Sequence, residues 1–202
     1  MAAQDTRSRI IEAATGLFAE HGYSGTGMRA LTRAAGVNIA AVNYHFGGKV
    51  ELLRAVFAQL GEEVNRDRAA RLAALGPDAS VRELVTALVE PVRERVSATD
   101  PTGRLVARLC GEPSPEVREV VIEEFAATEG AFGVALHRAL PHLPAAEFWW
   151  RFKTAIGLLL NDVSAFYTVA RLPGEPGPPA ADPDWLITFI TAGLSQRATA
   201  GK

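Results

Sequence analysis

The first 50 residues hold a set of polar and basic side chains whose chemistry suits nucleic acid. The set is Thr26, Arg29, Asn38, Asn43, Tyr44, His45 and Lys49. Arg29 and Lys49 can each neutralise a phosphate, while the Thr26 hydroxyl and the free backbone N–H groups of a helix start can hydrogen-bond one. This part of the chain therefore predicts contacts to a phosphate backbone.

A second, overlapping group has side chains that can contact base edges: Asn38, Ala40, Ala41 and Asn43. An asparagine can pair with adenine through two hydrogen bonds, and an alanine methyl can contact the methyl of thymine. No arginine or lysine lies between Val37 and His45, so the commonest contact to guanine is missing from this segment. We therefore expect specificity to depend in part on DNA shape.

Three helices must position these side chains. Apolar residues at helical spacing after Asp5 predict a first helix that Gly22 ends. Thr26 is expected to cap a short second helix that ends at Gly36, and Asn38 to cap a third that closes near Phe46, before Gly47 and Gly48. Two short helices joined by a tight turn can place one helix across the DNA backbone and the other in the major groove.

The remaining chain also shows helical periodicity. The expected ranges are about 49–74, 80–96, 102–110, 114–140, 145–171 and from 182 onward, with a proline-rich loop at 173–183. No alternating run of strand length is present. The predicted fold is all-α with about nine helices, made of an N-terminal three-helix head over residues 1–48 and a helical bundle over residues 49–202.

The head also carries a family resemblance. The residues that carry it, in order and spacing, are Thr6-Arg7, Ala13-Ala14, Leu17-Phe18, Gly22-Tyr23, Thr26, Ala34-Ala35-Gly36-Val37, Tyr44-His45-Phe46 and Lys49. Over about the first 57 residues the chain thereby resembles the TetR/AcrR family of bacterial transcriptional regulators. The resemblance implies that Tyr44 and His45 face backbone phosphates. Gly27 and Asn43 depart from the pattern, since a small hydroxyl or apolar residue and a tyrosine are usual there.

The same resemblance implies that the body binds a small apolar or amphipathic effector and forms a homodimer. We expect the effector site between the fifth and eighth helices, lined by Leu105, Arg108, Leu109, Phe125, Phe132, His137, Phe152 and Ile156. The tract from Arg108 to Pro115 resembles a subgroup whose ligands include fatty acyl thioesters. The last two helices carry more large apolar residues than one buried stripe needs, notably Trp149, Trp150, Phe166, Trp185 and Phe189, and we expect them to form the dimer interface.

Composition limits the other classes of function. The 202 residues carry 21 Lys and Arg against 23 Asp and Glu, but residues 1–50 carry five basic against three acidic residues, so the head is mildly basic. A single cysteine excludes an intramolecular disulfide, and no two histidines have helical metal-ligand spacing. No stretch reaches the roughly 18 apolar residues of a membrane span. We expect a cytoplasmic protein without a cofactor, metal or catalytic residue.

Two other classes of function remain open on the sequence alone. A small-molecule binding protein with little DNA affinity fits the segment between Val37 and His45, which lacks arginine and lysine. An enzyme that uses a cavity in the body would need a titratable pair in a cleft, and the sequence does not indicate one.

Overall fold

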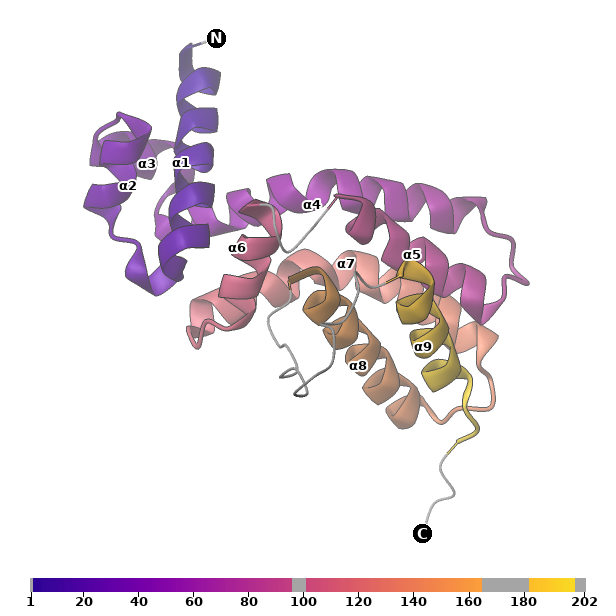
Figure 1. Ribbon diagram of the computed structural model, residues 1–202. Helices are drawn as coiled ribbons and strands as arrows, with labels where there is room; N and C mark the ends of the chain where they lie inside the picture. Colours follow the sequence, from indigo (N-terminus) through magenta and orange to yellow (C-terminus); the bar gives the residue numbers. More distant parts are fainter. Residues whose placement is uncertain (1, 96–100, 165–181, 199–202) are drawn as a thin grey trace. The chain divides into compact units, whose positions relative to one another are not determined.

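The computed structural model describes residues 2–95, 101–164 and 182–198 of the chain (Figure 1). In this part the elements are α1 Ala2–Gly25, α2 Met28–Ala35, α3 Ile39–Phe46, α4 Lys49–Ala74, α5 Val81–Arg95, α6 Pro101–Cys110, α7 Pro115–Ala139, α8 Ala145–Ser164 and α9 Pro183–Ser195. The predicted all-α fold with about nine helices is confirmed. The expected continuation of the eighth helix to residue 171, Phe166 within it, and most of the proline-rich loop lie outside the described residues.

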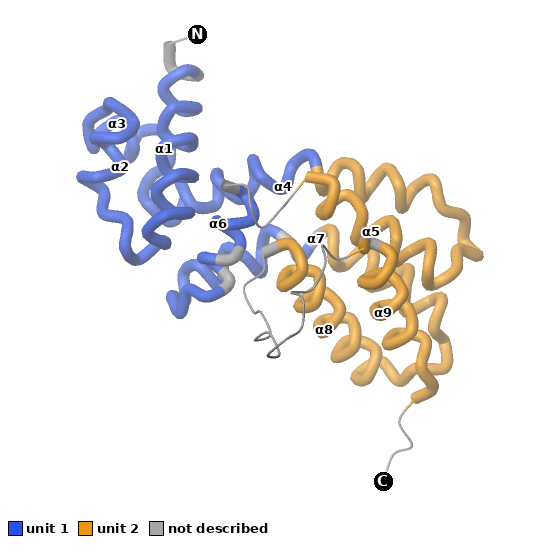
Figure 2. The backbone as a smooth tube through the Cα atoms, in the orientation of Figure 1, with its two compact units in different colours: residues 1–63, 96–126 blue, residues 64–95, 127–202 orange. Residues whose placement is uncertain are grey.

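The chain packs as two compact units (Figure 2). Unit 1 contains Met1–Glu63 and Val96–Ala126, and unit 2 contains Val64–Arg95 and Ala127–Lys202. Helices α4 and α7 each contribute to both units, because the division falls within them. The expected domain boundary between residues 48 and 49 stays a prediction. No helix among the described residues is both long enough and apolar enough to cross a membrane.

The core of unit 1 joins α1, α2 and α3 to α6 and to the first parts of α4 and α7. Its buried residues include Ile10, Ala14, Phe18, Leu31, Val42, Phe46, Leu52, Leu53, Val56, Leu105, Leu109, Val117 and Val120. The apolar stripe expected in the first three helices is therefore the packing surface of the head. Because α3 buries Val42 and Phe46 in this core, its opposite side faces outward.

Unit 2 buries apolar side chains of α5, α7, α8 and α9, including Leu88, Phe132, Leu136, Phe148, Phe152, Ile187, Ile190 and Leu194. Arg151 on α8 donates hydrogen bonds to the carbonyls of Gly193 (3.0 Å), Gln196 (2.7 Å) and Arg197 (3.0 Å), at the end of α9. A cationic group at the C-terminus of a helix satisfies carbonyls that lack helical partners. Arg151 therefore fixes the pairing of α8 with α9.

Glycines and one asparagine set the ends of the first three helices. Gly22 has φ +75° and ψ 172°, so α1 is interrupted there and resumes for residues 23–25 instead of ending. Gly36 (φ +64°) closes α2 in the left-handed conformation. Asn38 caps α3, as predicted, because its side chain accepts the backbone N–H of Ala41 at 2.9 Å.

Thr26 does not cap α2, contrary to the prediction. The residue at the cap is Gly27, which offers no side chain, and Thr26 is 1% exposed. Its hydroxyl donates to the carbonyls of Gly22 (2.7 Å) and Leu17 (3.1 Å). The interruption at Gly22 leaves carbonyls that need donors, and the inward-facing Thr26 provides one.

Replacing Gly22 by alanine is expected to destabilise the protein by about 1–3 kcal/mol, because only glycine readily adopts this backbone conformation. A Cβ atom there would also lie 2.7 Å from Glu112 Oε2. The matched control is Gly16→Ala in the same helix, where an added Cβ meets nothing within 4 Å. That change should stabilise the protein by about 0.5–1 kcal/mol. Urea denaturation measures both changes, and equal effects of the two substitutions would contradict this reading of Gly22.

Removing the cap of α3 by Asn38→Ala should lower the free energy of unfolding by about 0.5–2 kcal/mol. Asn38→Ser should stay within a few tenths of a kcal/mol, because a serine hydroxyl can accept the same N–H. Thermal denaturation of the two variants distinguishes them. A serine variant as unstable as the alanine variant would show that the cap contributes little.

Candidate nucleic-acid interface

Helices α2 and α3 are joined by a tight turn. The N–H of Gly36 donates to the carbonyl of Arg33 at 3.2 Å, and the N–H of Val37 to the carbonyl of Thr32 at 3.0 Å. Arg9 of α1 reaches over the end of α2 and donates to the carbonyls of Ala35 (2.5 Å) and Gly36 (3.2 Å). The arrangement of the two short helices is thus held by the hydrogen bonds of the turn and by those that Arg9 of α1 donates.

The outward side of α3 is formed by Ile39, Ala40, Asn43 and Tyr44. These residues lie three or four positions apart, which places them on one helix face. Tyr44 is 84% exposed and Ile39 is 50% exposed. This face mixes two apolar groups, one amide and one phenol, all of which can contact bases or phosphates in a groove.

Ile39 is an exposed residue of this face that is not among the residues predicted to contact DNA. The sequence signal for this position is the Asn38 cap. The residue after a cap occupies the first helical position, so its side chain projects from the start of the helix. An isoleucine side chain can contact a thymine methyl as alanine does. Ile39 thus adds an exposed apolar group to the face of α3.

The predicted base-contacting residues differ in how open they are. Ala40 and Asn43 are exposed, whereas Ala41 is half-buried. Asn38 is exposed, but its Oδ1 already accepts the N–H of Ala41. Because a bidentate contact to adenine needs both the oxygen and the amide nitrogen, Asn43 is better placed for that contact than Asn38.

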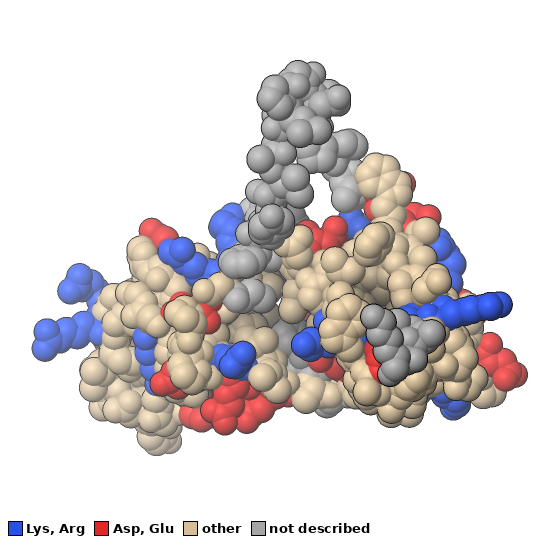
Figure 3. Space-filling view, turned by 90° about the horizontal axis from the view of Figure 1, so that it is seen from below, with Lys and Arg blue, Asp and Glu red and all other residues tan. Residues whose placement is uncertain are grey.

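The start of α2 offers donors for an anion. No side chain caps this helix, and the exposed Arg29 lies in its first turn, with Arg33 exposed in its last. Free N–H groups and the helix dipole favour negative charge at such an end. Figure 3 shows Lys and Arg side chains projecting from the part of unit 1 that α2 and α3 form.

The aromatic and basic groups near the end of α3 contact one another. The ring of His45, which is half-buried, lies edge-on to that of Tyr44 with centroids 5.2 Å apart. Arg7 of α1 lies over the ring of Phe46 at 5.3 Å. His45 is therefore partly covered by its neighbours, whereas Tyr44 is largely exposed.

Lys49 is held by Tyr23. Its Nζ donates to the Tyr23 carbonyl at 2.5 Å and lies 4.1 Å from the centroid of the Tyr23 ring. The pKa of Lys49 lies below its ordinary value, because burial lowers it by more than the nearby carboxylate of Glu112 raises it. The ammonium keeps further N–H groups beyond the one that Tyr23 accepts, so a phosphate contact stays a prediction for this residue.

The expectation that Thr26 faces outward is wrong. Its side chain is buried and its hydroxyl proton is committed to the carbonyls of α1. The remaining assignments to DNA contact stay predictions.

The residues predicted to line an effector site are divided between the two units. Leu105 and Leu109 are buried in the core of unit 1, and Arg108 donates to the carbonyl of Glu20 at 2.9 Å. Phe132 and Phe152 are buried in unit 2, where His137 stacks on Phe148 with centroids 4.6 Å apart and Ile156 is half-buried. The side chain of Phe125 lies outside the described part. This site stays a prediction.

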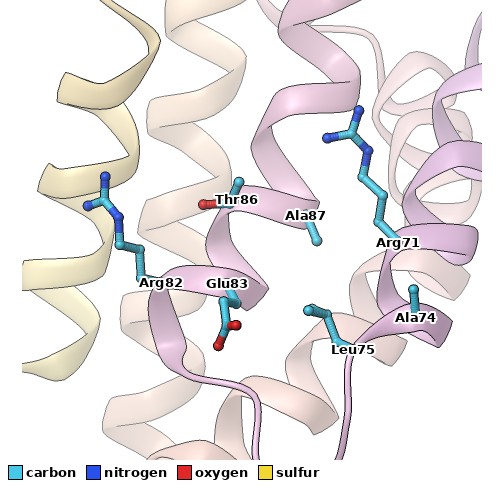
Figure 4. Close-up of a pocket in the computed structure, with 7 residues that line it drawn as sticks. All are labelled: Arg71, Ala74, Leu75, Arg82, Glu83, Thr86 and Ala87. Carbon is cyan, nitrogen blue, oxygen red and sulfur yellow. The ribbon is translucent and has the colours of Figure 1, made fainter.

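A described cavity in unit 2 has other walls. It measures about 390 Å³ and is lined by Arg71, Ala74, Leu75, Arg82, Glu83, Thr86 and Ala87. Figure 4 shows Leu75 and Ala87 pointing toward the space between α4 and α5. Each charged group that lines it has a protein partner: Arg71 pairs with Glu90 at 2.6 Å, Arg82 pairs with Asp184, and Glu83 accepts the N–H of Ser80 at 2.8 Å. The cavity therefore offers no unsatisfied charge to an effector.

Among the described residues, no group of three or more His, Cys, Asp or Glu side chains could hold a metal ion.

Known proteins resemble both parts of this chain. The family model of bacterial regulatory proteins of the tetR family matches residues 10–56, and the model of the tetracyclin repressor-like C-terminal domain matches residues 86–193. The HTH-type transcriptional regulator CymR of Pseudomonas putida is 29% identical over 167 residues, which cover 80% of this chain and 81% of that protein. An HTH-type transcriptional repressor of Mycobacterium tuberculosis is 30% identical over 152 residues, which cover 73% of each chain.

Solved structures share the fold. The fatty acid degradation regulator FadR from Bacillus halodurans aligns with a TM-score of 0.67 at 18% identity and covers 94% of each chain. The TetR family transcriptional regulator PfmR from Thermus thermophilus aligns with a TM-score of 0.60 at 20% identity, covering 93% of this chain and 95% of that one. The two family models together span the head and most of the body, and the chain therefore belongs to the tetR family of bacterial regulatory proteins.

Proposed function

We propose that this regulator is a dimeric repressor that inserts α3 into the major groove of an operator and is released by a small apolar or amphipathic effector. The observation that carries the DNA-binding part is the outward face of α3, Ile39, Ala40, Asn43 and Tyr44, beside the uncapped start of α2. Its relatives are transcriptional regulators by name. It acts in the cytoplasm, where bacterial DNA lies.

The contacts divide into two kinds. Arg29, the N–H groups at the start of α2, Tyr44, His45 and Lys49 bind phosphates and fix the register of the protein on the duplex. Asn43 reads adenine, and Ile39 and Ala40 contact thymine methyls. Since this face carries no arginine, A·T-rich half-sites are the expected operator, with DNA shape adding to the specificity.

The dimer interface is the outer face of α8 and α9. Regulators of this family act on their operators as dimers, and on this chain Trp150, Trp185 and Phe189 are 63%, 58% and 66% exposed. A groove of about 100 Å³ between the two helices lies beside Trp150 and Phe189. An exposed aromatic face of this kind suits burial against a second copy. Dimerisation would set the two α3 helices about 34–36 Å apart, one turn of DNA.

The proposed effector site is the apolar part of unit 2 around Phe132 and Phe152, two members of the set predicted from the sequence. A modest coupling is enough for regulation, since about 1–3 kcal/mol changes operator affinity by about 5- to 150-fold. Acyl thioesters belong in an effector screen because of the tract from Arg108 to Pro115.

The direct test selects duplexes from random DNA with the full-length protein and measures their affinity by fluorescence anisotropy. We expect a palindromic site whose binding weakens steeply with salt. Tight binding of a small molecule by a protein that enriches no duplex would instead favour the second candidate, a ligand-binding protein with little DNA affinity.

Arg29→Ala should weaken operator binding and make the salt dependence shallower. Each lost phosphate contact reduces the slope of log K against log salt by about 0.9 per protomer. Arg118→Ala is the matched control, because Arg118 is equally an exposed arginine of unit 1 but lies on α7. An unchanged slope in the Arg29 variant would remove this residue from the interface.

Trp150→Glu and Phe189→Glu should each convert the dimer to a monomer in sedimentation velocity, because each places a charge in an apolar interface. Val134→Glu controls for exposure alone, since Val134 is 67% exposed on α7. Dimers that persist in both variants, or a monomeric wild-type protein, would refute this interface.

A further inference from the structure

The interruption of α1 at Gly22 is held together by side chains of a distant segment. The backbone turns out of the helical path at Gly22 and resumes at Tyr23. Arg108, on the last turn of α6, donates from Nη2 to the carbonyl of Glu20 at 2.9 Å. Glu112, two residues past α6, accepts the N–H of Tyr23 at 3.2 Å through Oε2. Backbone groups on the two sides of the interruption are therefore bonded to one short segment.

The charges of the two side chains match the backbone groups that they meet. The first part of α1 ends in carbonyls, which carry partial negative charge and attract a guanidinium. The segment after the interruption begins with N–H groups, which attract a carboxylate. Hydrogen bonds to charged groups are about twice as strong as bonds between neutral ones. Arg108 and Glu112 thus act as a matched pair across the interruption.

The same peptide continues into the nucleic-acid interface. The Tyr23 carbonyl accepts the Nζ of Lys49 at 2.5 Å and the N–H of Thr26 at 3.2 Å. Thr26 is followed by Gly27, the cap of α2. The Tyr23 residue is therefore bonded on its N–H side to Glu112 and on its carbonyl side to the starts of α2 and α4.

We infer that Arg108 and Glu112 are positioning residues for operator binding, which hold the interruption of α1 and so fix the start of α2 and the ammonium of Lys49. This inference rests on the proposed function, because its effect is read through DNA affinity. Arg108, which the sequence predicts to bind the effector, gains a different role here. Neither side chain contacts DNA.

The variants are Glu112→Ala, Glu112→Gln and Arg108→Met in the full-length protein. A glutamine oxygen can still accept the N–H of Tyr23, whereas alanine cannot. Methionine keeps most of the length and apolar character of the arginine side chain but has no N–H donor. The controls are Glu119→Ala and Arg118→Met, at exposed positions of α7 in the same unit.

On the selected duplex, Glu112→Ala and Arg108→Met should each weaken binding about tenfold, the cost of one lost hydrogen bond to a charged group. Glu112→Gln should bind within about twofold of the wild type, as should both controls. Wild-type affinity in both Glu112→Ala and Arg108→Met would overturn the inference.

Hydrogen exchange of the protein without DNA separates this inference from the proposed function. The amide of Tyr23 should exchange faster in Glu112→Ala than in the wild type and in Glu112→Gln, because it loses its acceptor. Unchanged exchange would overturn the inference even where DNA binding falls. If the wild-type protein enriches no duplex, the proposed function fails. The exchange rate of the Tyr23 amide still tests whether Arg108 and Glu112 hold the interruption of α1. Should Glu112→Ala not fold, Arg108→Met decides the matter, since wild-type affinity in that variant would overturn the inference.

Discussion

The burial of Val42 and Phe46 is the constraint on which the interface depends. Helix α3 has only eight residues, so burying these two in the core of unit 1 leaves one possible outward face. That face consists of Ile39, Ala40, Asn43 and Tyr44, and the burial of the other side determines which way it points. The polar chemistry of the head is therefore positioned by apolar contacts, as expected where a short helix has little stability of its own.

Hydrogen bonds from side chains to the backbone also hold the first three helices in place. Arg9 bonds the end of α2, Asn38 caps α3, and Thr26 bonds the carbonyls around Gly22. Each of these side chains could have faced a ligand, and each instead satisfies a backbone group. A residue type suited to nucleic acid is thus an incomplete guide to its role, because helix ends compete for the same donors and acceptors.

The sequence predicts the helical elements well and the individual contacts less well. The apolar spacing from Ile10 to Phe18, the glycine at 36 and the asparagine at 38 are local signals, and the structure follows them. A threonine before a helix is a common cap, so the local pattern predicts the wrong role for Thr26, whose hydroxyl instead donates to the carbonyls of Leu17 and Gly22. The roles of Arg108 and Glu112 depend on a contact between segments almost 90 residues apart, which no local pattern could indicate.

The most direct test of the central claim is a dimethyl sulfate footprint of the selected operator. The reagent methylates guanine N7 in the major groove and adenine N3 in the minor groove, so it reports which groove the protein occupies. With α3 in the major groove of each half-site, the guanine N7 atoms within or next to the A·T-rich half-sites should be protected in two patches about 34–36 Å apart. Protection confined to adenine N3, or a single protected patch per bound dimer, would contradict the account.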